Sequence, residues 1–171
     1  MAFREIRKAR QGQTMSPEDC EEVLERASHG VLALLGDGDY PYAVPLSYAR
    51  AGDALYFHSF IHGHKIDALT RHDKASFCVV DLDEVIPEEF TTHYRSVIAW
   101  GRVSLIEGDE DKRQALTVLA DRYCRAGIEA DYEEKLKAEI DKSWPACLCF
   151  KLEIEHLSGK LSRALKAEQH L

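Results

Sequence analysis

Groups that bind anions are concentrated in residues 56–65, where an apolar run gives way to a glycine and a basic pair. His64 and Lys65 follow Gly63 and precede apolar residues spaced as on one helix face, which predicts a short helix that ends near residue 72. The first turn of a helix offers free backbone N–H groups and a partial positive charge. Together with the Lys65 ammonium group and the nearby Ser59 hydroxyl, this spacing predicts a phosphate site.

Two other interpretations of these residues were weighed. The histidines His58, His62 and His64 fall within seven residues, but no carboxylate or thiol completes a recognisable ligand set, so no metal site is predicted. A solvated helix start with no ligand is the simpler alternative. A second cation and hydroxyl, Arg95 and Ser96, open a later apolar segment and can add to an anion site.

Several strands must position these groups. A helix is expected from Ser16, which can cap it, and strands are expected over 31–35, 42–48 and 55–60 with turns at 36–39 and 51–53. Three strands in succession predict an antiparallel meander. Pro45 lacks an N–H group, which places its strand at an edge or at a bulge.

The second half of the chain adds three strands and two helices. Strands are expected over 75–80, 94–106 and 147–154, with an acidic loop around Pro87 and a bend at Gly101, and helices over 109–124 and 132–142. The total of six strands with peripheral helices predicts a mainly β protein, a small barrel in a single domain that covers residues 1–171.

Composition narrows the class of protein. The formal net charge of −8 argues against nucleic acid or an anionic membrane as a partner, and no apolar run approaches the roughly 20 residues of a membrane span. The odd number of cysteines and the lack of a signal peptide favour a cytoplasmic protein with free thiols. Cys147 and Cys149 would share one side of a strand, so a redox pair is the alternative interpretation.

The order of several short motifs resembles the pyridoxamine 5′-phosphate oxidase-related flavoproteins, and within them the nitroimidazole-resistance, or NimA-like, branch. The resemblance covers roughly residues 3–160. It rests on His29-Gly30-Val31, Tyr40-Pro41-Tyr42-Ala43-Val44-Pro45-Leu46-Ser47, Tyr56-Phe57-His58-Ser59, Gly63-His64-Lys65, Tyr94-Arg95-Ser96-Val97 and Ser158-Gly159-Lys160.

This resemblance implies a six-stranded antiparallel split β-barrel that forms a homodimer with FMN at each subunit interface. His64 and Lys65 would hold the FMN phosphate, with His58 and Ser59 nearby. The flavin ring would lie along residues 44–47. Arg95 and Ser96 would complete the site, either from the same subunit or from the second one. The full expected set of cofactor contacts is Val44, Pro45, Leu46, Ser47, His58, Ser59, His64, Lys65, Arg95, Ser96, Val97 and Trp144.

The activity implied is that of a reductase, in which NAD(P)H reduces the flavin and the flavin reduces a small electrophile such as a nitroaromatic compound. His64 is the expected catalytic residue. The vitamin B6 oxidases of the family carry arginine at its position and an arginine-rich C-terminal motif that this chain lacks, so their own activity is not expected. The alternatives are a non-enzymatic flavin-binding or electron-transfer module, or a split barrel that binds heme or a deazaflavin.

Overall fold

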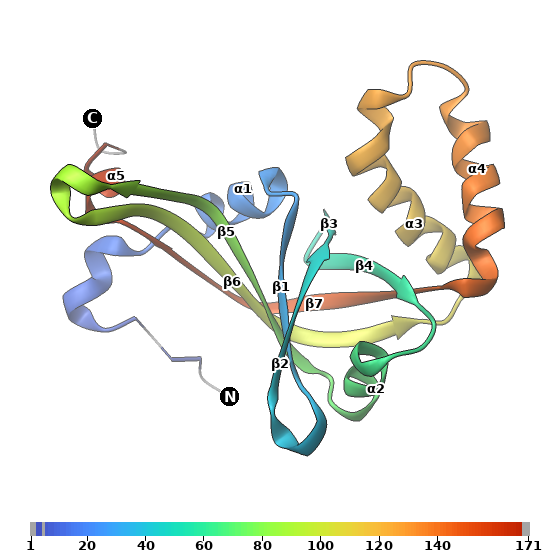
Figure 1. Ribbon diagram of the computed structural model, residues 1–171, viewed down its shortest axis with the longest axis horizontal. Helices are drawn as coiled ribbons and strands as arrows, with labels where there is room; N and C mark the ends of the chain where they lie inside the picture. The colour runs from blue at the N-terminus through green and yellow to red at the C-terminus, as the bar shows by residue number, and fades with distance from the viewer. Residues whose placement is uncertain (1–2, 5, 169–171) are drawn as a thin grey trace.

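A long, twisted antiparallel sheet forms the body of the protein in the computed structural model, which describes residues 3–4 and 6–168 (Figure 1). Seven strands of the described chain follow the order β2-β1-β5-β6-β7-β4-β3. Their bounds are β1 (His29–Leu35), β2 (Pro41–Ser47), β3 (Ala49–Ala51), β4 (Ala54–Phe60), β5 (Lys74–Ile86), β6 (Thr91–Ile106) and β7 (Cys147–Leu161).

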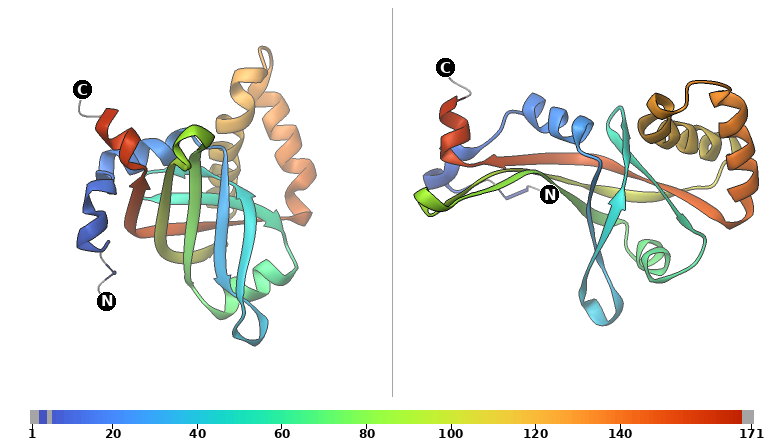
Figure 2. Two further views of the ribbon diagram at one scale, coloured as in Figure 1. Left: turned by 60° about the vertical axis from the view of Figure 1, so that its left-hand side comes forward. Right: turned by 45° about the horizontal axis from the view of Figure 1, so that its top comes forward.

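Helices lie around the sheet rather than in a separate domain. In Figure 2, α3 and α4 form an antiparallel hairpin beside one end of the sheet, and α1 and α5 lie near its other end. The bounds are α1 (Pro17–Arg26), α2 (His64–Arg71), α3 (Asp109–Cys124), α4 (Tyr132–Ser143) and α5 (Arg163–Glu168). The predicted cap of α1 is confirmed, since the Asp19 N–H donates to the Ser16 hydroxyl oxygen over 3.1 Å.

The prediction of a mainly β protein with an antiparallel sheet and peripheral helices is confirmed, but the predicted meander and the six-stranded barrel are wrong, because the sheet has seven strands and is not closed. The strand expected over 42–48 corresponds to β2, which pairs with β1, and after the bend at Tyr48 an additional short strand, β3, pairs with β4. These two segments therefore occupy opposite ends of the strand order, and the sheet is open in its pairing. The prediction failed because an alternating pattern of apolar residues does not identify which neighbour a strand will pair with.

The prediction of an acidic loop around Pro87 is also wrong, because strand β5 occupies most of that segment. A register shift between Val80 and Leu82 lets β5 continue to Ile86, paired with the first residues of β6. The two strands form a hairpin arm that projects from the body (Figure 1). The expected irregularity at Gly101 is confirmed by a register shift after Trp100. A Cβ atom at Gly101 would lie 1.9 Å from the Glu153 carbonyl oxygen, so only glycine fits there.

An aromatic cluster forms the centre of the main core. Phe57 lies with its ring centroid 4.9 Å from that of Phe150 and 5.1 Å from that of Phe77, and Tyr48 packs 4.8 Å from Phe77. All four side chains are fully buried. They come from β4, β5, β7 and the bend at Tyr48, so the cluster joins the two ends of the sheet.

A polar contact fixes the bend at Tyr48 against α3. The Tyr48 N–H donates to the Tyr123 hydroxyl oxygen over 3.0 Å, and the Tyr123 hydroxyl lies 2.6 Å from the Tyr48 carbonyl oxygen. Tyr123→Phe is expected to lower the free energy of unfolding by about 1–3 kcal/mol, because it leaves the backbone groups of a buried residue unpaired. Urea unfolding measures this cost. Tyr40→Phe is the control, since Tyr40 is 77% exposed, and equal effects of the two substitutions would contradict the prediction.

Among the described residues, no helix combines the length and the apolar character needed to cross a lipid bilayer.

Candidate functional site

The start of α2 has the geometry of an anion site. Gly63 adopts a φ of 123°, and no side chain caps the helix. The N–H groups of Ile66 and Asp67 donate to the Gly63 carbonyl oxygen over 2.8 and 3.1 Å. The N–H groups of His64 and Lys65 precede these bonds and so have no acceptor within the helix.

A cavity of 420 Å³ opens at this helix start. It is lined by Tyr42, His58, Ser59, Phe60, His62, Gly63, His64 and Lys65. The structure therefore brings together four residues that the sequence predicted as a group: His58, Ser59, His64 and Lys65.

Lys65 carries the positive charge of this cavity without a counter-ion. No described carboxylate forms an ion pair with its ammonium group, although the side chain is half-buried. Burial lowers the pKa of Lys65, because partial loss of water disfavours the charged form. A bound anion would reverse this penalty, so the cavity is electrostatically suited to a phosphate or a carboxylate.

His64 is held by two residues that sequence reasoning missed. Its ring stacks on Tyr42 with centroids 4.1 Å apart, and its Nε2 lies 3.7 Å from an Asp37 carboxylate oxygen. Asp37 also pairs with Arg71 at the end of α2, over 2.7 Å. Asp37 lies in the turn between β1 and β2, where an aspartate is common, so the sequence held no signal of its contact with α2.

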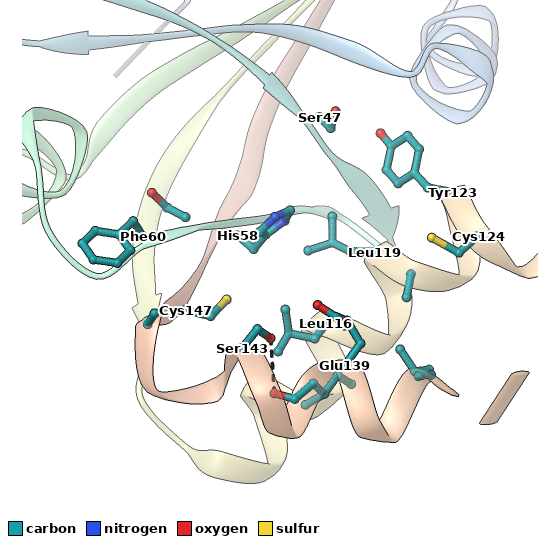
Figure 3. Close-up of a pocket in the computed structure, with 15 residues that line it drawn as sticks. Ser47, His58, Phe60, Leu116, Leu119, Tyr123, Cys124, Glu139, Ser143 and Cys147 are labelled. Carbon is teal, nitrogen blue, oxygen red and sulfur yellow. Dashed lines mark hydrogen bonds between the residues drawn. The ribbon is translucent and has the colours of Figure 1, made fainter. Parts of the chain in front are cut away.

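A second, larger cavity of 590 Å³ adjoins the first and shares His58, Ser59 and Phe60 with it. In Figure 3, Ser47, Tyr123 and His58 border one side of this space, and Leu116, Glu139 and Ser143 border the other. The cavity lies between strands β4 and β7 and the α3–α4 hairpin. On α3, Leu119 is buried and Leu116 and Ala120 are half-buried, and all three line the cavity.

His58 lies where the two cavities meet. Loss of water around the ring lowers its pKa, and the nearby Lys65 charge lowers it further. The ring is accessible to solvent at its surface, but it lies in a concave place where protein atoms replace much of its hydration. Both causes favour the neutral imidazole, which can donate one hydrogen bond and accept another.

The four predicted contacts on β2 divide between its two faces. Val44 and Leu46 turn inward and pack against the main core, while Pro45 and Ser47 are exposed. Ser47 lines the larger cavity. The strand is an edge strand, as the presence of Pro45 predicted. The backbone groups on its outer edge are therefore free of sheet pairing.

The predicted Arg95, Ser96 and Val97 lie far from this site in the same chain. His58 is aligned through Cys149 with Ile106 of β6, ten residues beyond Ser96. Ten residues of strand span on the order of 30 Å. Val97 is fully buried in the main core.

Arg95 belongs to an ion-pair cluster at the base of the hairpin arm. The Asp81 carboxylate lies 2.6 Å from Arg95 and 2.6 Å from Arg26 of α1, and only 7% of its side chain is exposed. Burial acts to raise the Asp81 pKa, but hydrogen bonds and charges from the two arginines outweigh burial and hold the pKa below its ordinary value.

This cluster predicts a dependence of stability on acid. A carboxyl whose pKa is lower in the folded state stabilises the protein above its unfolded pKa, and this contribution is lost as the pH falls through the folded pKa. Asp81→Asn is expected to cost about 1–3 kcal/mol near neutral pH and much less in acid. Urea unfolding from about pH 7 to about pH 3 tests this, and a cost that does not change with pH would contradict it. Asp53→Asn, in an exposed turn, is the control.

Trp144 also lies apart from both cavities. It follows α4 at the start of the short helix Trp144–Ala146, where the Lys112 ammonium group lies 3.9 Å from its ring centroid. The same ammonium group donates to the Trp144 carbonyl oxygen over 3.0 Å. The ring is half-buried under α3, so its observed contacts are cation–π contacts to that helix.

Comparison with known proteins identifies a family match over most of the chain. Residues 16–161 match the family model described as pyridoxamine 5′-phosphate oxidase. An uncharacterized protein of Rhizobium meliloti is 33% identical over 88 residues, which are 52% of this chain, and the chain spans about half (53%) of that relative's length.

Two solved structures share the fold. A FAD- and heme-binding protein from Mycobacterium smegmatis is 29% identical, with a TM-score of 0.69 over 89% of this chain and 74% of that chain. A proposed 5-nitroimidazole antibiotic resistance protein from Bacteroides thetaiotaomicron is 21% identical, with a TM-score of 0.71 over 86% of each chain.

Proposed function

Because the chain belongs to the pyridoxamine 5′-phosphate oxidase family, we propose that it binds FMN and works as a reductase of a small electrophile. The main support is the half-buried Lys65 ammonium group, which has no described counter-ion and lies in a cavity at the uncapped start of α2. Partial burial of an unpaired cation costs free energy unless an anion pairs with it. The FMN phosphate is the anion that the family implies.

The residues present fit this cofactor. Lys65 and the free N–H groups at the start of α2 hold the phosphate, and Ser59 adds a hydroxyl donor from the same cavity. The unpaired outer edge of β2, over residues 44–47, offers backbone donors and acceptors to the polar edge of the flavin ring. His64 is placed to hold a proton at Nε2, since Asp37 lies beside that atom.

The bound flavin would supply two-electron chemistry, taking electrons from NAD(P)H and passing them to the acceptor. The chain itself orients the cofactor, limits access of water and tunes the charge around the ring. A site with one cation and a neutral His58 favours the negative phosphate but leaves the adjoining space uncharged.

The first experiment is the absorption spectrum of the purified protein, before and after addition of FMN. Bands near roughly 375 and 450 nm are expected from a bound flavin. Chromatography of the released cofactor distinguishes FMN from FAD. A Soret band in place of the flavin bands would identify a heme and contradict the proposal, and so would a colourless protein that does not respond to FMN.

The proposed functional unit is a homodimer. The arm that carries Arg95 and Ser96 projects from the body and bears exposed apolar residues, including Val85 at 67% and Phe90 at 99% exposure. Both exposed side chains and the remote position of Arg95 are accounted for if the arm reaches the cofactor site of a second copy.

Mixing two inactive variants tests this arrangement. Lys65→Ala and Arg95→Ala each remove a group from the proposed site, but a mixed dimer would have one site that retains both. Recovery of FMN binding to about a quarter of the wild-type level in an equal, randomly assorted mixture is expected. A mixture that binds no more FMN than its separate components would refute the shared site, and a monomer by light scattering with FMN present would refute the dimer.

A further inference from the structure

The larger cavity has walls that come from two different layers. Strands β4 and β7 form one wall, with His58 and Phe60 opposite Cys149 and Cys147 across the ladder, and the α3–α4 hairpin forms the other. Apolar side chains from both helices line the cavity: Leu116, Leu119, Ala120, Leu136 and Ile140. Its volume of 590 Å³ lies within the range of small-molecule sites.

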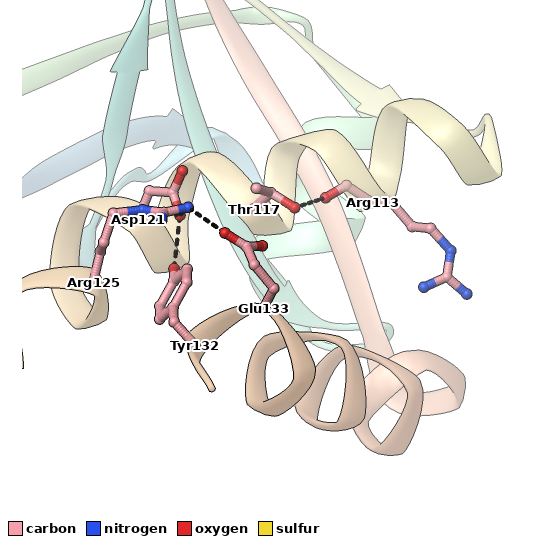
Figure 4. A network of polar contacts seen from close by, with 6 residues as sticks. All are labelled: Arg113, Thr117, Asp121, Arg125, Tyr132 and Glu133. Atoms are coloured by element: carbon pink, nitrogen blue, oxygen red, sulfur yellow. Dashed lines mark hydrogen bonds and ion pairs between the residues drawn. The ribbon is translucent and has the colours of Figure 1, made fainter. Parts of the chain in front are cut away.

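Polar contacts join α4 to α3 at both ends of α4. Near its start, Asp121 accepts a hydrogen bond from the Tyr132 hydroxyl over 2.7 Å, and Arg125 pairs with Asp121 and Glu133 over 2.9 and 3.0 Å (Figure 4). Near its end, Arg113 pairs with Asp141 over 3.0 Å. These contacts link the two helices on either side of the apolar residues that line the cavity.

The charges around the cavity differ from those of the anion site. Among the residues that line it, Glu139 is the one acidic side chain, and its carboxylate pairs with Lys142 over 3.1 Å. No lysine or arginine lines the cavity in the described part of the chain. An anionic ligand would therefore lose water without gaining a cation, and a cationic ligand would meet a carboxylate that is already paired.

Hydrogen-bonding groups border the cavity on two sides. On one side, Glu139 pairs with Lys142 and the Ser143 hydroxyl donates to the Ile140 carbonyl oxygen, and the remaining groups lie on the other side. Ser47, His58 and Tyr123 lie there (Figure 3), and His58 and Ser59 also line the anion site. We infer that this cavity, which adjoins the proposed flavin site and shares His58 and Ser59 with it, is an acceptor site that takes an uncharged ligand with an apolar body and one hydrogen-bonding end directed to His58. The inference rests on the proposed function in making the ligand an acceptor, but the binding itself does not require a flavin.

A matched pair of ligands tests the charge and the location. Isothermal titration calorimetry would measure binding of 2-naphthol, which is uncharged near neutral pH, and of the similarly sized anion 2-naphthoate, to the protein with and without FMN. The naphthol is expected to bind about tenfold more tightly or better, because burying an unpaired carboxylate is costly. FMN loading should change the naphthol dissociation constant by less than about threefold. In free energy, this is under half of the tenfold difference expected between the two ligands.

Substitutions that fill the cavity test whether the ligand binds there. Leu136→Trp on α4 and Ala120→Phe on α3 fill the cavity from separate helices, and each is expected to weaken naphthol binding by about tenfold or more through the lost space. Lys137→Trp, at an exposed residue of α4 that does not line the cavity, is the matched control and should bind as wild type. His58→Ala should weaken the naphthol more than it weakens naphthalene, which has no hydrogen-bonding end. Circular dichroism confirms that each variant is folded.

The outcomes separate this inference from the proposed function. Lys65→Ala should weaken FMN binding by about tenfold or more but keep naphthol binding. Naphthol that is displaced by FMN would identify the cavity as part of the flavin site and overturn the inference. Equal affinity for the naphthoate, or naphthol binding unaffected by both filling variants when they are folded, would also overturn it. A protein that binds naphthol as expected but never binds FMN would refute the flavin proposal alone.

Discussion

Lys65→Ala is expected to weaken FMN binding by roughly 10- to 150-fold, because a charge-assisted hydrogen bond contributes about 1.5–3 kcal/mol. The ammonium group is half-buried, lies in the cavity at the start of α2 and has no described counter-ion. The backbone N–H groups at the helix start remain in the variant, which is why binding weakens rather than disappears. Fluorescence titration of the flavin-free protein measures the dissociation constant.

Two comparisons make this result specific. Lys74→Ala removes an exposed lysine elsewhere on the protein and is expected to bind FMN as wild type. Burial lowers the pKa of Lys65, so the charged form that binds phosphate is lost at a lower pH than for an exposed lysine. Wild-type affinity should therefore fall as the pH rises through that pKa, and the slope should disappear in Lys65→Ala. Unchanged FMN affinity in this variant would remove the assignment of the phosphate site.

Phe57→Ala is expected to lower the free energy of unfolding by about 3–5 kcal/mol, the usual cost of truncating a fully buried phenylalanine. Phe57 contacts Tyr48, Phe77 and Phe150, so the substitution opens a cavity where both ends of the sheet meet. A loss of this size is a large share of the roughly 5–15 kcal/mol that holds an ordinary domain folded.

Phe60→Ala provides the matched control on the same strand. Phe60 lies three residues further along β4 with 61% of its surface exposed, so its truncation should cost under about 1 kcal/mol. Urea unfolding of both variants gives the comparison. A similar cost for the two would mean that the aromatic cluster is not the stabilising centre of the core.

The sequence predicted elements better than it predicted their pairing. Capping at Ser16, the helix that starts at His64 and the irregularity at Gly101 are local features, and each is written in a few adjacent residues. The bend at Tyr48 depends on a backbone group of α1 and a side chain of α3, because the Tyr48 hydroxyl donates to the Leu24 carbonyl oxygen and the Tyr48 N–H donates to the Tyr123 hydroxyl oxygen. No pattern within β2 could reveal those distant partners.

In the candidate site too, the sequence predicted local features but not contacts between distant segments. His58, Ser59, His64 and Lys65 are close in sequence, and the structure gathers them around one cavity. The contact of Asp37 with His64 and the wall formed by α3 and α4 join segments far apart in the chain. Arg95 and Ser96 were expected from their residue types and from the family resemblance, but they lie about thirty residues along the chain from His64, and residue spacing alone could not place them relative to it.

The strand order also governs how the molecule can be made. β7 pairs with β6 on one side and with β4 on the other, and it follows all the other strands in the chain. Until residues 147–161 have been synthesised, the β1–β2 and β5–β6 hairpins can form one half-sheet and the β3–β4 hairpin another, but nothing pairs the two halves. A ribosome adds about 5–20 residues each second, so an incomplete sheet with open edges persists for seconds. The nascent chain is thus most exposed to aggregation just before β7 emerges, and a stall at that point would favour capture by a chaperone over folding.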